Sequence, residues 1–89
     1  MLRISHIDGM EGATILRLEG NVSGVWVDEL RRLAQVTLAN GEVLTIDCAG
    51  VSFIDLQGRI LIRELLSRHV RLTNCSPFLQ SQINADSDS

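Results

Sequence analysis

The chain has 89 residues, a net charge of −3 and no lysine, so it has room for a single domain. Nucleic-acid phosphates are bound by clustered Lys and Arg, and this acidic balance excludes nucleic acid as the main partner. No apolar run approaches the roughly 20 residues that span a bilayer. The N-terminus also lacks the apolar core of a signal peptide. We therefore expect a cytoplasmic protein that does not insert into membranes.

The two cysteines, Cys48 and Cys75, fit that compartment, because a small secreted domain usually carries a larger disulfide framework. Together with His6 and His69 they lack the closely spaced ligand pairs that zinc sites show. We expect buried thiols and surface histidines, with no metal and no cofactor.

The first element is a strand over residues 2–7, in which polar and apolar side chains alternate. Turn residues follow at 8–12, and residues 13–19 form a second strand that Gly20 ends. Two short strands around a glycine-rich connection predict a β-hairpin.

A helix follows, with Ser23 as its expected N-cap. Its apolar face recurs at spacings of three and four, which is the helical period. The residues of that face are Trp26, Leu30, Leu33, Ala34, Thr37 and Leu38. Asn40-Gly41 predicts its end.

Residues 42–48 are apolar and β-branched with little contrast between faces, which indicates a central strand covered on both sides. Ala49-Gly50 is expected to turn the chain into a short extended segment, 51–54. A second helix beyond Asp55 has the apolar stripe Leu61, Ile62, Leu65 and Leu66. Residues 69–73 alternate as a strand, and Ser76-Pro77 opens a third helix that runs to about Ile83.

The predicted order is therefore β-β-α-β-α-β-α, an α/β fold with a small, mostly parallel four-stranded sheet started by a hairpin. Residues 1–83 form the single domain. Residues 84–89 have nothing to bury, and we expect a disordered tail.

The segment Val51–Gly58, with sequence VSFIDLQG, resembles the signature of the STAS family, to which the bacterial anti-sigma-factor antagonists belong. That signature is a short apolar strand, then Asp, two small hydroxyl residues and Gly at the start of a helix. Segments 20–30, 45–51 and 74–77 resemble other turns and strands of the family. The resemblance covers roughly residues 12–83, and it implies a truncated STAS-like fold and a protein-binding role in transcription regulation.

Two departures from the family pattern stand out. Gln57 occupies the position of the serine that a partner kinase phosphorylates, and Leu56 precedes it; neither has a hydroxyl. The chain also stops where the family normally adds a strand and a helix. An uncovered apolar surface is then expected, which a second copy or a partner protein would cover.

The chemistry of the residues at 55–59 also indicates a role for this loop, independently of the resemblance. Asp55 at an N-cap would accept hydrogen bonds from the first N–H groups of the helix, and Gly58 would let another backbone approach closely. The alternative is that both are purely structural. Exposed first-turn residues such as Leu56 and Gln57 favour contact with a partner. Arg59 is either a contact for an acidic partner or part of a solvated face.

By resemblance, the docking surface also includes the turn that holds Asn21 and Ser23. We expect a non-catalytic interaction module, because the sequence offers no phosphate loop, paired carboxylates or catalytic triad. It would bind a kinase-like anti-sigma regulator without a phosphorylation switch at Gln57, although Ser52 is an alternative phosphate acceptor. Two other roles stay open, a cytoplasmic subunit of a membrane transporter complex and a sensor of nucleotides or other small ligands.

Overall fold

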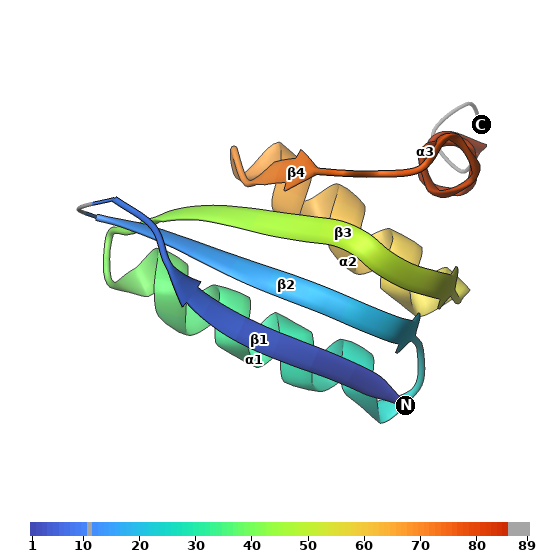
Figure 1. Cartoon of the computed structure of the whole chain (residues 1–89), viewed down its shortest axis with the longest axis horizontal. Helices are drawn as coiled ribbons and strands as arrows, with labels where there is room; N and C mark the ends of the chain where they lie inside the picture. Colours follow the sequence, from blue (N-terminus) through green and yellow to red (C-terminus); the bar gives the residue numbers. More distant parts are fainter. Residues whose placement is uncertain (11, 86–89) are drawn as a thin grey trace.

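A computed structural model describes residues 1–10 and 12–85 of the chain, and these residues contain four strands and three helices (Figure 1). The strands are β1 (Leu2–Asp8), β2 (Ala13–Val22), β3 (Val43–Ile54) and β4 (Arg71–Thr73). The helices are α1 (Val25–Ala39), α2 (Leu56–Ser67) and α3 (Pro77–Ala85). This order is the predicted β-β-α-β-α-β-α. None of the helices in this part of the chain is long and apolar enough to cross a membrane.

The strands form one sheet in the order β1-β2-β3-β4. β1 and β2 are an antiparallel hairpin, while β2–β3 and β3–β4 are parallel pairs. The predicted α/β fold is thus confirmed, with a hairpin leading into a mostly parallel sheet. Helical crossovers are what allow consecutive parallel strands to lie side by side.

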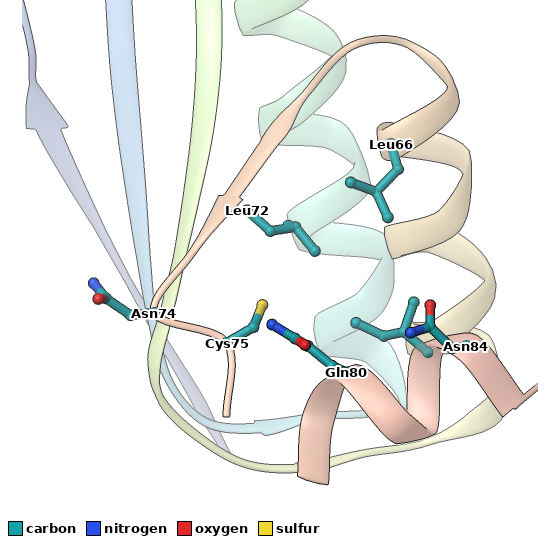
Figure 2. A pocket seen from close by; sticks show the side chains of 7 residues that line it. Leu66, Leu72, Asn74, Cys75, Gln80 and Asn84 are labelled. Carbon is teal, nitrogen blue, oxygen red and sulfur yellow. The ribbon is translucent and has the colours of Figure 1, made fainter. Parts of the chain in front are cut away.

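All three helices lie on one side of the sheet (Figure 2). The side chains of β2 that point to the helices, such as Leu16 and Leu18, are fully buried, whereas those between them are partly or wholly exposed. The expectation that the strand over residues 42–48 is covered on both faces is wrong, since Val43 is 56% exposed. Phe53, further along β3, is also more than half exposed. The two crossover helices, α1 and α2, and the C-terminal helix α3 all cover the same face (Figure 2), so the other face remains open.

β3 is one continuous strand, and the predicted turn at Ala49-Gly50 is a β-bulge within it. Glu19 of β2 pairs with Gly50, although Arg17 pairs with Asp47, so β3 carries an extra residue between these pairs. A second register shift follows between Gly20 and Asn21. Bulges bend a strand without ending it, which is why small residues here do not produce a turn.

α1 begins one residue later than predicted. Its N-cap is Gly24, with a φ of 59°, and no side chain caps the helix. Ser23 lies just outside, and its carbonyl accepts from the N–H of Trp26 at 3.2 Å. The left-handed backbone at this position favours glycine over serine, so the chain uses glycine for geometry and loses the hydroxyl cap.

α2 buries Leu61, Ile62 and Leu65 as predicted, but Leu66 is 42% exposed. Leu66 faces a cavity between α2, β4 and α3 instead of the core. Ser76 caps α3, since its hydroxyl accepts from the N–H of Leu79 at 3.1 Å. α3 continues to Ala85, two residues past the predicted end. Of the predicted disordered tail, residues 86–89 lie outside the described residues.

Candidate functional site

The Asp55 carboxylate joins two loops that are far apart in the sequence. It follows β3 directly and is the N-cap of α2, where its Oδ1 accepts from the N–H of Gly58 at 2.7 Å. Its Oδ2 accepts from the N–H of Gly24, the N-cap of α1, at 3.1 Å. One side chain thus satisfies an N–H group in the first turn of α2 and another at the start of α1, where helices leave such donors unpaired. The predicted N-cap role of Asp55 is confirmed, and the link to Gly24 is additional.

Gly58 provides the close approach beneath this link. A Cβ at this position would lie 2.7 Å from the carbonyl oxygen of Val22 and 2.8 Å from Cγ1 of Ile54. Both distances are too short for any larger residue, so α2 packs against the ends of β2 and β3 only because residue 58 is glycine. This contact holds the first turn of α2 in place.

Exposed apolar residues flank both linked residues in the chain. Val25 follows Gly24 and is 74% exposed; Leu56 follows Asp55 and is 51% exposed; Phe53, two residues before Asp55, is 51% exposed. Exposed apolar residues that gather at one place mark a surface for protein contact. Sequence reasoning missed Val25 and Phe53. Val25 lies off the apolar face of α1, and that mismatch was the available signal.

The other predicted site residues lie at the same end of the sheet. Gln57 is exposed in the first turn of α2, and Arg59 is half-buried, with a guanidinium N–H donating to the carbonyl of Ile54 at 3.4 Å. Asn21 pairs in register with Phe53 at the end of β2, and Ser23 is half-buried in the loop that follows. The loops that carry all seven predicted residues therefore meet around the Asp55–Gly24 hydrogen bond, and we call this region the Asp55 end.

A second carboxylate, Asp47, lies in the middle of β3 on the open face of the sheet and is only 8% exposed. Its Oδ1 accepts from the N–H of Ala49 in the bulge at 3.0 Å and from the amide of Asn74 at 3.1 Å. Arg17 Nε donates to Oδ2 at 3.4 Å. The Ala49 N–H, the Asn74 amide and the Arg17 guanidinium hold the pKa of Asp47 below its ordinary value, against the opposing effect of burial. Both carboxylate oxygens of Asp47 accept hydrogen bonds from the protein itself, so we interpret this cluster as structural.

The model of the STAS domain family matches residues 4–84. The chain belongs to the STAS domain family. Its fold is similar to that of the anti-sigma factor antagonist SpoIIAA in its unphosphorylated form, with a TM-score of 0.72 and 21% sequence identity over 92% of this chain and 82% of that one. It is also similar to an anti-sigma factor antagonist from Mycobacterium paratuberculosis, with a TM-score of 0.68 and 16% identity over 81% of this chain.

The chain covers 64% of that mycobacterial structure. No match was found among curated proteins. At these identities the structural likeness establishes the fold. Within the STAS fold, the family signature predicted at Val51–Gly58 corresponds to the end of β3 and the first turn of α2.

Proposed function

We propose that this STAS domain is a non-catalytic protein-binding module whose docking surface is the Asp55 end. The observation that supports this proposal is the combination of a fixed backbone with an exposed apolar rim, which we define as Val25, Phe53 and Leu56. The Asp55 carboxylate and the Gly58 packing hold the two loops, while Val25, Phe53 and Leu56 stay exposed. A preorganised surface binds more tightly because little conformational freedom is lost on association.

The partner we propose is a kinase-like anti-sigma regulator. The support is the family signature at Val51–Gly58 and the similarity of the fold to the two anti-sigma factor antagonists. Binding at this surface is not switched by phosphorylation at residue 57, because the exposed Gln57 has no hydroxyl. An amide there offers a fixed hydrogen-bonding contact where a phosphoserine would bring charge near −2.

Binding to purified anti-sigma kinases from the source genome, measured by calorimetry, tests the docking surface. Replacement of Leu56 by Asp puts a charge into the apolar rim and should weaken binding at least about tenfold. The matched control is Val36→Asp, which puts the same charge on an equally exposed apolar residue of α1, about three turns from Val25, and should leave the affinity unchanged. Equal loss of affinity in both variants would contradict the assignment of the surface.

The absence of a switch needs a separate experiment. Incubation with the bound kinase and ATP should leave the peptide that contains residues 52–57 at its unmodified mass. The Gln57→Ser variant should gain about 80 Da there and lose affinity. Ser52 is also exposed, so fragmentation of the peptide must locate any phosphate. A phosphate on Ser52 of the natural chain would overturn the constitutive binding.

A further inference from the structure

The two cysteines come from separate elements and meet at one edge of the sheet. Cys48 lies on β3, faces the helices and is buried with 3% exposure. Cys75 follows β4 and packs against the buried cluster that contains Cys48. Cys75 is also one of the groups that raise the pKa of Cys48, which agrees with the two side chains being neighbours. Both are free cysteines.

The strand register explains why they meet. The last pair of the parallel β3–β4 ladder joins Asp47 to Thr73. Cys48 is the next residue of β3, and Cys75 lies two residues past Thr73, beyond the left-handed turn at Asn74 with a φ of 58°. Neighbouring strands lie about 4.8 Å apart, and disulfides join residues whose Cα atoms are about 4.4–6.8 Å apart. The register therefore places Cys48 beside the turn that carries Cys75, one residue and two residues beyond a paired position, where a disulfide would not require the strands to separate.

The two thiols differ in access. Cys75 is half-buried and lines the cavity of about 330 Å³ between α2, β4 and α3. In Figure 2 its sulfur points into that cavity, on the helix side of the sheet between Leu72 and Gln80. Burial, the Cys75 thiol and the Asp47 carboxylate raise the pKa of Cys48. Cys48 therefore stays a protonated, protected thiol, and a reagent that enters the cavity meets Cys75 first.

We propose that Cys48 and Cys75 are a redox modification site that forms an intramolecular disulfide, with Cys75 as the entry thiol and Cys48 as the resolving thiol. The oxidant is a small disulfide such as oxidised glutathione. This site lies away from the Asp55 end and does not depend on the proposed docking function.

The chemistry balances in two exchange steps. The Cys75 thiolate attacks one sulfur of oxidised glutathione, the glutathione S–S bond breaks, and one glutathione thiolate leaves. Cys48 then passes its proton to the glutathione thiolate released in the first step, and its sulfur attacks the Cys75 sulfur of the mixed disulfide. The second glutathione leaves as a thiolate. The protein loses two electrons and two protons, and oxidised glutathione is reduced to two molecules of glutathione.

The disulfide fastens the β4–α3 turn to β3. β4 is a three-residue edge strand that pairs only with β3, so the bond adds a covalent link where the sheet has the fewest hydrogen bonds. It also takes the Cys75 sulfur from the cavity wall toward β3, which alters the cavity between α2, β4 and α3.

The test is the equilibrium of the full chain with a glutathione redox buffer, in native buffer and in denaturing urea. The disulfide should be at least about tenfold more favoured in the folded chain, because the fold holds the thiols together. The product should be a monomer that has lost about 2 Da and both reactive thiols. An equilibrium constant in the folded chain equal to or below that in urea, or cross-linked dimers as the main product, would overturn the proposal.

Single variants test the order of attack. In Cys48→Ala the folded chain should stop at a stable glutathione adduct on Cys75, because no resolving thiol remains. In Cys75→Ser the folded chain should stay unmodified over the same time, because Cys48 is buried. An adduct that forms on Cys48 in this variant as fast as in the natural chain would show that Cys75 is not the entry point.

Discussion

The chain carries two aspartates along the path of β3, and each accepts hydrogen bonds from backbone N–H groups for a different purpose. Asp47 is buried in mid-strand, where its carboxylate accepts hydrogen bonds from the N–H of Ala49 in the bulge, the amide of Asn74 and the exposed guanidinium of Arg17. Asp55 follows the strand and joins the N-termini of two helices through Gly24 and Gly58.

The surroundings of the two carboxylates separate their roles. Asp47 has polar partners, and no large apolar side chain within two residues of it is exposed, since Ile46 and Cys48 are buried and the exposed residue there is the small Ala49. Asp55 instead has exposed Val25, Phe53 and Leu56 within two residues of its hydrogen bonds. A bound carboxylate alone indicates stability; a bound carboxylate inside an exposed apolar rim indicates a surface built to be contacted.

The largest effect is expected from Gly58→Ala, which tests whether packing as well as Asp55 fixes the Asp55 end. The added methyl group would meet the Val22 carbonyl and Ile54, and overpacking outweighs the better helix propensity of alanine. We expect a loss of about 2 kcal/mol in the free energy of unfolding, measured in urea.

Gln57→Ala is the matched control, since it changes the preceding residue on the exposed surface. It should alter the free energy of unfolding by no more than about 0.5 kcal/mol. A Gly58→Ala variant as stable as this control would mean that the first turn of α2 is not held by close packing.

Asp47→Ala should cost somewhat less, about 1.5 kcal/mol, because it leaves the Ala49 N–H and the Asn74 amide without their acceptor in a buried place. Arg17 contributes little to this cost, since its side chain is 51% exposed. The affinity for the partner should not change, because Asp47 lies outside the proposed docking surface. An Asp47→Ala variant with the stability of the natural chain but without partner binding would contradict the separate roles of the two aspartates.

The pKa of Asp47 adds a pH dependence to the same variant. The pKa of Asp47 is lower in the folded state than its ordinary value, which is near 3.9. The stability that the Asp47 carboxylate supplies is therefore fully present above the ordinary pKa. It is lost as the pH falls through the lowered pKa. The urea midpoints of the natural chain and of Asp47→Ala should therefore converge as the pH falls below about 4. A constant difference from pH 7 down to that range would contradict the direction of the shift.

Asp55→Ala should cost about 1 kcal/mol, the usual value for a lost N-cap, and should also weaken partner binding because Gly24 is released. Ser76→Ala removes the cap of α3 and should cost a similar amount without any effect on binding. The pair therefore separates helix capping from loop positioning. Equal affinities for the two variants would show that Asp55 serves only as a cap.

The smallest effect concerns the ion pair that joins α1 to α2, in which Arg31 Nη1 lies 2.5 Å from Glu64 Oε2. Both side chains are partly exposed, so Arg31→Gln should cost no more than about 0.5 kcal/mol, and less at high salt. Urea unfolding at low and high salt measures it. A cost comparable to that of Asp47→Ala would mean that α1 and α2 depend on charge rather than on their apolar contacts.

The sequence by itself determined the order of elements, the hairpin, the apolar faces of α1 and α2 and the N-cap at Asp55. These features follow from local periodicity, turn residues and capping, which act between residues close in the chain. The signature at Val51–Gly58 located the Asp55 end for the same reason, since all its residues are consecutive.

The tertiary structure alone decided what depends on partners distant in sequence. The bond from Asp55 to Gly24 spans 31 residues, the bulge at Ala49 requires the register of β2, and Cys48 meets Cys75 only through the pairing of β3 with β4. The sequence pattern also did not predict the open face of the sheet, because an apolar strand does not show whether helices cover one face of the sheet or both. Local interactions determine the helices and strands, whereas the pairing of strands determines which side chains from distant parts of the sequence lie together.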